Sequence, residues 1–153
     1  MSTSTPTNSD DQALAERVVN AMMARDAFSR WLGIEVLNVR PRSATIRMRV
    51  REDMLNGFGV CHGGALFSLA DSALAFACNT HGRITVSIEN SVTYPVAIYA
   101  GDELTAVAIE ENATRKLAFY RVEIRRESAI VSIFRGTVFN TEKPFFASPP
   151  PQT

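Results

Sequence analysis

Residues 62–78, HGGALFSLADSALAFAC, are the stretch that decides the fold of this chain. The stretch is rich in helix formers, contains no proline, and puts apolar or small residues on most faces of a helix. Such a helix must be surrounded by protein. One carboxylate, Asp71, nevertheless lies near its middle. Because a buried unpaired carboxylate would cost several kcal/mol or take up a proton, we expect Asp71 to line a cavity.

Segments with the alternation of half-buried strands lie on both sides of this helix. Before it, residues 43–51 alternate apolar and polar side chains, next to a second strand segment at residues 34–40. Because the later strand segments follow one another without intervening helices, antiparallel pairing by short connections is expected. The sequence therefore predicts an α+β fold, a curved antiparallel β-sheet wrapped around a central α-helix. The later segments are residues 84–94, 103–111, 116–126 and 129–139.

The whole chain has the size and composition of one globular domain. Of its 153 residues, 46% are hydrophobic and 21% are charged. Its 16 basic and 16 acidic residues cancel, which argues against a protein that coats nucleic acid or an anionic membrane. Tails are predicted at residues 1–9 and at the proline-rich residues 144–153, on either side of a domain at residues 10–143. That domain is expected to begin with an amphipathic N-terminal helix from about Asp10 to Arg25.

The start of the chain and its cysteines favour a cytoplasmic location. Residues 1–12 have neither a basic n-region nor an apolar h-region, so they do not resemble a secretory signal. No apolar run is long enough to span a bilayer. Cys61 and Cys78 are too few for a disulfide framework, so we expect two free thiols packed as small apolar groups. His62 and His81 add no C-x-x-C or H-x-x-x-H pair, so no metal site is expected.

A compact set of residues around the start of the helix could carry chemistry. Asn56, followed by glycine, is first of all a turn signal, and His62 alone is more often a hydrogen-bonded structural histidine. The pair Gly63 and Gly64 costs helix stability and suggests that something approaches the backbone closely. The N–H groups at a helix start favour an anion or a developing oxyanion.

Gly63 and Asp71 of one chain are too far apart to serve one reacting group. Eight residues correspond to about 12 Å along a helix. An oxyanion donor and an attacking group must both lie about 3 Å from atoms of the same carbonyl. Two copies of the helix, antiparallel across a twofold axis, would bring Gly63 of one chain near Asp71 of the other. If the protein is an enzyme, the spacing predicts a homodimer with two shared sites.

Other catalytic patterns fit the sequence less well. Ser68 lies inside the helix, four residues after Gly64, and not in a G-x-S-x-G turn, which disfavours a serine-hydrolase triad with His62. Neither the Walker A pattern nor the Rossmann glycine pattern is present. Basic residues concentrate late in the chain, where a solvated sheet face is the default interpretation and a phosphate grip is the alternative. They are Arg115, Lys116, Arg121, Arg125 and Arg126.

Residues 56–82, NGFGVCHGGALFSLADSALAFACNTHG, closely resemble the signature of the PaaI-type (phenylacetate-degradation) thioesterases, a hot-dog-fold family that hydrolyses acyl-coenzyme A. The later segments AGDELTAVA, RKLAFYRVEI and IVSIFRGTVF fall where that family has its remaining strands, so the resemblance spans about residues 28–139. It implies a single hot-dog domain that forms homodimers, often paired into homotetramers, with active sites at the subunit interface. It also implies acyl-CoA as the substrate class and no metal or organic cofactor.

The resemblance implies roles for individual residues. Asp71 would act as general base for water or as nucleophile on the thioester carbonyl, and the Gly63 N–H would polarise that carbonyl. Asn56 would orient the acid or the water, and His62 would support the loop and contact the substrate near its sulfur. Ser87 is expected to hold the water. The other substrate-binding candidates are Gly64, Ser72 and, near the nucleotide of coenzyme A, Arg115 and Lys116.

The acyl group is less well specified than the reaction. Residues 94–99, YPVAIY, differ from the Y-L-R-P-A pattern of many family members, with Pro95 directly after Tyr94 and no arginine. Aromatic (phenylacetyl-like) acyl-CoA, medium-chain acyl-CoA and an acyl-carrier-protein thioester therefore all stay open, and a place in phenylacetate catabolism does not follow from the signature. Two other functions stay open as well: a non-catalytic acyl-CoA-binding or regulatory hot-dog protein, and a hot-dog dehydratase or hydratase.

Overall fold

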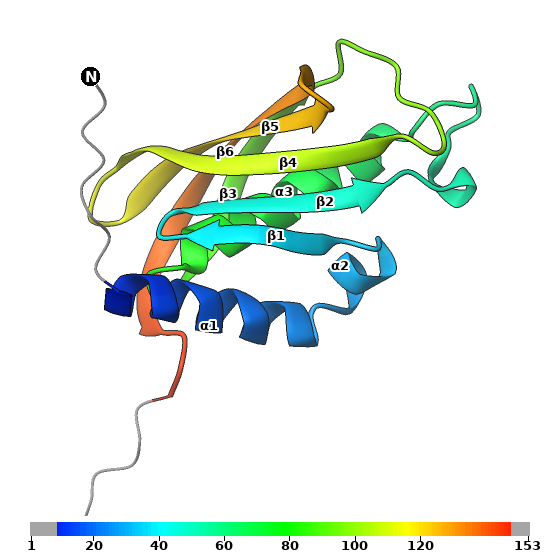
Figure 1. Ribbon diagram of the computed structural model, residues 1–153. Helices are drawn as coiled ribbons and strands as arrows, with labels where there is room; N and C mark the ends of the chain where they lie inside the picture. The colour runs from blue at the N-terminus through cyan, green and yellow to red at the C-terminus, as the bar shows by residue number, and fades with distance from the viewer. Residues whose placement is uncertain (1–8, 148–153) are drawn as a thin grey trace, which may run out of the picture.

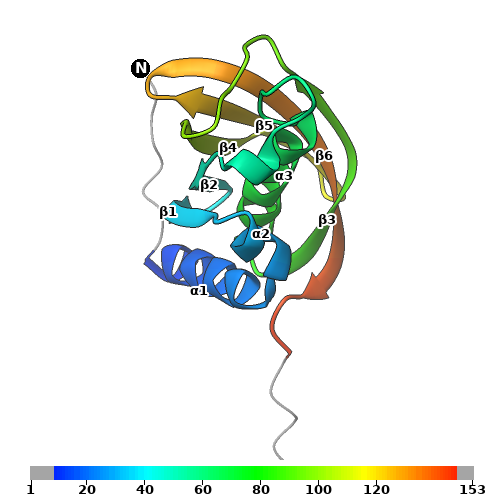
Figure 2. The same ribbon diagram turned by 90° about the vertical axis from the view of Figure 1, so that its right-hand side faces the viewer.

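The computed structural model describes residues 9–147. Its six-stranded antiparallel sheet has the strand order β1-β2-β4-β5-β6-β3 and packs against one long helix, α3 (Gly63–Asn79) (Figure 1). Figure 2 shows α3 inside the curve of the sheet. The predicted α+β fold, with a curved antiparallel sheet around a central helix, is confirmed.

The strands lie where the alternating segments predict them. They are β1 (Glu35–Arg40), β2 (Ser43–Arg49), β3 (Arg83–Thr93), β4 (Glu103–Ala113), β5 (Leu117–Arg126) and β6 (Ala129–Pro144). The predicted N-terminal helix is α1 (Ser9–Arg25), and two short elements are additional: α2 (Ala27–Trp31) and the 3₁₀ turn η1 (Glu52–Met54). Both are too short to show a helical period in the sequence.

Helix α3 is the core element because its small residues let the sheet approach closely. Leu69, Ala70, Ala73, Leu74 and Ala77 are each 0% exposed. Helix α3 contacts strands from both halves of the sheet, β2 and β4 on one side and β5, β6 and β3 on the other. The apolar character of residues 62–78 therefore follows from enclosure by the sheet, as expected.

The two edge strands of the sheet differ in what lies beside them. The edge strand β1 lies beside α1, whose Gln12 Nε2 donates to the Val39 carbonyl oxygen at 2.8 Å. The other edge strand, β3, pairs only with β6 in the described part of the chain, and it carries exposed apolar side chains at Ile84, Val86 and Ile88. An open strand edge with apolar side chains is a surface on which another strand can pair.

The predicted tails lie mostly outside the described residues. Residues 1–8 and 148–153 are not described, so the boundaries of the predicted domain at residues 10–143 stay a prediction. Just after β6, the Phe145 N–H donates to the Gly82 carbonyl oxygen at 2.8 Å, and the Arg17 guanidinium lies 4.8 Å from the centre of the Phe146 ring. Within residues 9–147, no helix is long and apolar enough to cross a membrane.

Candidate active site

Asp71 is a half-buried carboxylate on α3, bonded to a neighbouring strand. Its Oδ1 accepts a hydrogen bond from Asn90 Nδ2 of β3 at 3.4 Å, and its Oδ2 has no hydrogen-bond partner among the described residues. Burial raises the pKa of the Asp71 carboxyl, the Asn90 hydrogen bond lowers it, and the negative charge of Asp26 raises it further. The net direction is upward, as for a carboxylate being prepared to accept a proton.

Ser87 is connected to Asp71 through Asn90. The Ser87 Oγ donates to Asn90 Oδ1 at 2.8 Å, and the other end of the same carboxamide donates to Asp71. The sequence singles out Ser87 and Asp71 but not Asn90, which looks like an ordinary polar position of an alternating strand. The sequence feature that could have pointed to Asn90 is Gly136, on the neighbouring strand β6. A glycine within a strand often indicates that another group approaches the backbone closely.

The N-terminus of α3 presents one free backbone donor. The Gly63 N–H has no acceptor within residues 9–147, whereas the Gly64 N–H donates to His62 Nδ1 at 2.8 Å. His62 is therefore the N-cap of α3, and its Nε2 is the ring nitrogen left for a substrate. Of the two adjacent glycines, Gly63 alone has an N–H available to an oxyanion.

Both glycines are explained by rings of the protein itself. A Cβ on Gly63 would lie 3.1 Å from Tyr94 Cζ, and the Tyr94 hydroxyl donates to the Gly63 carbonyl oxygen at 3.0 Å. A Cβ on Gly64 would lie 2.9 Å from His62 Nδ1. The close approach predicted from the glycine pair is thus made by Tyr94 and His62.

Asn56 shapes the loop before α3. Its Oδ1 accepts from the N–H groups of Phe58 at 2.9 Å and Val60 at 3.3 Å, and its own N–H donates to the Val60 carbonyl oxygen at 2.8 Å. These bonds fold residues 56–60 into a tight turn, as the turn signal predicts. The Asn56 Nδ2 makes no hydrogen bond to a described residue, so it is the part of the side chain that could reach an acid or a water.

Two cavities of about 330 Å³ each flank the start of α3. One is lined by Asn56, Gly63 and Tyr94 together with apolar residues of the segment after β3. The other is lined by His62 and Gly64 and by the aromatic rings of Phe28 and Trp31 from α2. Each has a volume in the range of small-molecule sites.

Ser72 is held by a buried serine of α2. The Ser72 and Ser29 hydroxyls lie 2.8 Å apart, and the Ser29 Oγ donates to Asp26 Oδ2 at 2.6 Å. Ser29 is 0% exposed. This chain of hydrogen bonds attaches α2 to α3 directly beside Asp71. The predicted contact of Ser72 with a substrate stays a prediction.

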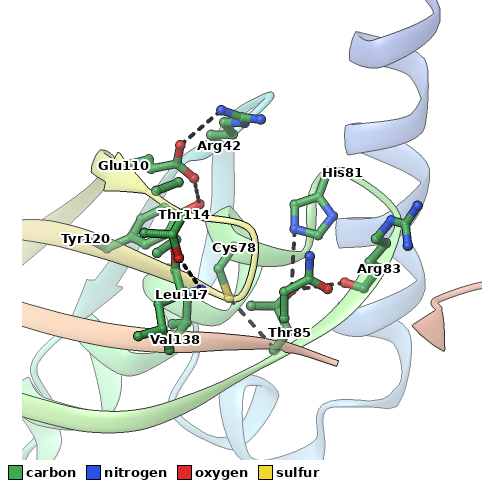
Figure 3. Close-up of a pocket in the computed structure, with 13 residues that line it drawn as sticks. Arg42, Cys78, His81, Arg83, Thr85, Glu110, Thr114, Leu117, Tyr120 and Val138 are labelled. Atoms are coloured by element: carbon green, nitrogen blue, oxygen red, sulfur yellow. Dashed lines mark hydrogen bonds and ion pairs between the residues drawn. The ribbon is translucent and has the colours of Figure 1, made fainter. Parts of the chain in front are cut away.

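Arg115 and Lys116 lie at the other end of the molecule from Gly63 of the same chain. Both bind Glu142 of β6, at 3.0 Å from Arg115 Nη1 and 2.6 Å from Lys116 Nζ. They follow Thr114, which lines a cavity of about 260 Å³ at the C-terminal end of α3, together with Cys78 and residues of β3, β4 and β5 (Figure 3). The other late basic residues are also in ion pairs, Arg121 and Arg125 with Glu123 and Arg126 with Asp102. The predicted solvated sheet face and its alternative, a phosphate grip, both stay predictions for these residues.

Both cysteines are free and buried, as predicted. Burial is the main cause that raises the pKa of the Cys61 thiol to about 11 and that of the Cys78 thiol to about 12. Thiols with such pKa values are protonated and unreactive at neutral pH. Within residues 9–147, no group of three or more His, Cys, Asp or Glu side chains is placed to hold a metal ion.

Comparison with known proteins identifies relatives along most of the chain. The family model described as Thioesterase superfamily matches residues 58–133. The Escherichia coli acyl-coenzyme A thioesterase PaaI is 38% identical over 118 residues, which cover 76% of this chain and 84% of that protein. Human acyl-coenzyme A thioesterase 13 is 30% identical over 128 residues, which cover 82% of this chain and 91% of that protein.

Solved structures of related proteins also match the fold of this chain. The structure of E. coli PaaI matches with a TM-score of 0.84 at 34% identity, over 87% of this chain and 97% of that chain. A hypothetical thioesterase protein with coenzyme A from Streptococcus pneumoniae matches with a TM-score of 0.69 at 26% identity, over 72% of this chain and 88% of that chain.

Proposed function

The chain belongs to the thioesterase superfamily of hot-dog proteins, and from that premise we propose that it is a PaaI-like acyl-CoA thioesterase that uses Asp71 and the Gly63 N–H. The observation that carries the assignment of residues is the Asp71 carboxylate, half-buried in an otherwise apolar helix, with one oxygen hydrogen-bonded by Asn90 and the other without a protein partner. An enclosed structural acid would have both oxygens satisfied.

The chemistry needs only these groups and water. As general base, Asp71 takes a proton from a water molecule whose oxygen attacks the thioester carbonyl carbon. The carbonyl oxygen then carries the negative charge and is stabilised by the Gly63 N–H and the positive end of the α3 dipole. When the C–S bond breaks, the thiolate leaves and is protonated, giving free acid and CoA. In the alternative route, Asp71 attacks the carbonyl itself and water hydrolyses the resulting anhydride.

The active unit in this proposal is a homodimer with shared sites, which is able to pair further into a homotetramer. The free edge of β3 supports a twofold pairing with β3 of a second copy, because its unpaired backbone groups and its exposed Ile84, Val86 and Ile88 gain partners there. Such a pairing sets the two α3 helices antiparallel. Each Gly63 then approaches the Asp71 of the other subunit, as the 12 Å estimate within one helix requires.

The substrate is proposed to be the CoA thioester of an aromatic, phenylacetyl-like acid or of a medium-chain acid. The S. pneumoniae relative contains coenzyme A, and the E. coli and human relatives are named for acyl-coenzyme A, which supports CoA as the leaving group. The cavity lined by Phe28 and Trp31 offers apolar surface to an acyl group of either kind. A reducing cytoplasm is the expected compartment for such a substrate and for two free thiols.

The test is to incubate the protein with a panel of aromatic and medium-chain acyl-CoAs and to follow the release of free thiol. Asp71→Ala, checked for fold by circular dichroism, should lower kcat by about a hundredfold or more, the contribution of a positioned general base. Equal activity in the folded variant would refute the role of Asp71. Tight acyl-CoA binding without thiol release would favour a regulatory module, and hydration of an enoyl-CoA without thiol release a hydratase.

A further inference from the structure

Strand β3 has a β-bulge at Ile88, where its side chains change the side of the sheet that they face. It pairs with β6 so that Ser87 is opposite Val138 and Glu89 is opposite Thr137, and Ile88 is the extra residue of a β-bulge between these pairs. In a regular strand, residues three apart face opposite sides of the sheet. Because the bulge inserts one residue, Ser87 and Asn90 lie on the same side, which is the side of α3.

The ionised Asp71 carboxylate decides which end of the Asn90 carboxamide faces it, and the Ser87 hydroxyl bonds to the other end. Asn90 Nδ2 points to Asp71 Oδ1, at 3.4 Å, and the Ser87 hydroxyl donates to Asn90 Oδ1 at 2.8 Å. The reverse orientation would bring the carboxamide oxygen against a carboxylate oxygen, two acceptors without a proton between them. The carboxamide thus presents a donor to the ionised acid.

Gly136 leaves the space in which this carboxamide lies. It is opposite Asn90 in the β3–β6 register. A Cβ at position 136 would lie 2.8 Å from Asn90 Oδ1 and 2.5 Å from Leu74 Cδ2, both closer than real Cβ contacts. Leu74 is fully buried on α3, one turn beyond Asp71, so the neighbouring side chains have little room to give way.

The groups around Asp71 shift the pKa of its carboxyl in opposite directions. Asp26, between α1 and α2, is the charged residue with a resolved effect on it, and it disfavours a second negative charge. Burial between the sheet and α3 also disfavours the charge. Asn90 is the group that favours the ionised carboxylate, the form that can act as base or nucleophile.

We infer that Asn90 is a positioning residue for Asp71: the bulge at Ile88 aims its carboxamide at the carboxylate, Ser87 bonds to the carboxamide oxygen, and Gly136 gives the carboxamide space. This inference rests on the proposed function, because it assigns Asn90 to the reaction that Asp71 performs. Asn90 contacts the carboxylate, so in this inference its effect passes through the ionisation and orientation of Asp71.

The test compares Asn90→Leu, which keeps the approximate volume but removes the donor, with Ser91→Ala, an exposed neighbour on the other face of β3. For Asn90→Leu we expect kcat at pH 7 to fall about tenfold, the loss that one hydrogen bond to a charged group corresponds to. The acid limb of the pH profile should move to higher pH, the rate should approach that of the wild type at alkaline pH, and KM should change less than twofold. Ser91→Ala should keep the wild-type profile.

A second readout does not depend on catalysis. The pKa of the Asp71 carboxyl, followed by carbon-13 NMR, should be higher in Asn90→Leu than in the wild type. Ser87→Ala, which removes only a surface hydroxyl, should move it in the same direction by less, and this variant replaces Asn90→Leu if the latter does not fold. An unchanged pKa in both variants, or a loss of kcat without a shift of the acid limb, would overturn the inference. An active Asp71→Ala would instead overturn the proposed function, whatever the NMR result.

Discussion

The junction between α3 and β3 depends on one buried side chain, Asn79, and its removal is our most quantitative prediction. The Asn79 Nδ2 donates to the carbonyl oxygens of Ala75 at 2.9 Å and Thr85 at 3.0 Å, and its Oδ1 accepts from the Thr85 N–H at 2.9 Å. Asn79 is 5% exposed and Thr85 is 7% exposed. The Asn79 carboxamide therefore bonds to the backbone N–H and carbonyl oxygen of Thr85, as a neighbouring strand would.

Asn79→Ala leaves the Thr85 N–H and carbonyl oxygen without the Asn79 carboxamide as partner, in a buried environment that little water reaches. Each buried group left unsatisfied costs about 1–3 kcal/mol. Because Thr85 is close enough to the surface for some water to reach it, we expect the free energy of unfolding to fall by about 3 kcal/mol, from two groups near the lower half of that range. For a chain of this size that corresponds to a decrease in Tm of about 6–12 °C.

The measurement is urea unfolding followed by the fluorescence of Trp31, the single tryptophan of the chain, at one fixed protein concentration. The matched control is Asn112→Ala on β4. Asn112 is exposed, and among residues 9–147 its Oδ1 accepts only from the neighbouring Ala113 N–H, so its removal should change the free energy of unfolding by less than about 0.5 kcal/mol. If Asn79→Ala were as stable as this control, the account of the junction would be refuted.

Two further predictions concern the site. Because burial raises the pKa of Asp71 in the folded state above its ordinary value of 3.8, the stability that this group contributes is complete below that value and is lost as pH rises through the raised pKa. Asp71→Asn should therefore unfold at higher urea than the wild type at pH 7, with the difference disappearing below pH 3.8; a less stable variant at pH 7 would contradict this. If the sites are shared, mixing inactive Asp71→Ala subunits with Gly63→Pro subunits, which lack the N–H at the first position of α3, should restore activity. Because a Cβ at position 63 would lie 3.1 Å from Tyr94 Cζ, the Tyr94 ring must shift in this variant, and its fold is checked first by circular dichroism. Random pairing makes half of the dimers mixed, and each mixed dimer holds one intact site out of two, so we expect roughly a quarter of the wild-type activity. If each site were formed within one chain, mixing would restore no activity.

Several features of the site could be predicted from the sequence because they depend on local spacing. The helix at residues 62–78 and the free thiols follow from apolar periodicity and composition, and both are confirmed. The turn at Asn56 follows from its residue type. The distance that separates Gly63 from Asp71 follows from the helical rise alone.

Other features needed the pairing of distant segments. The close approach expected at Gly64 is confirmed, but only the structure shows that the approaching ring is that of its neighbour His62. The hydrogen bond between Ser72 and Ser29 needs α2, which has too few residues to leave a pattern. The ion pairs of Arg115 and Lys116 with Glu142 need the pairing of β5 with β6.

By itself, the sequence determined that an apolar helix carries one acid, that strands surround it, and that the acid and the free N–H of one helix are too far apart to meet. Those statements depend on residues near one another in the chain. The tertiary structure alone decided which groups contact that acid. Asn90 faces Asp71 only because β3 bulges at Ile88 where it pairs with β6, and it fits only because Gly136 is opposite. A strand's alternation is local, but the register that shifts it is set by the strand beside it.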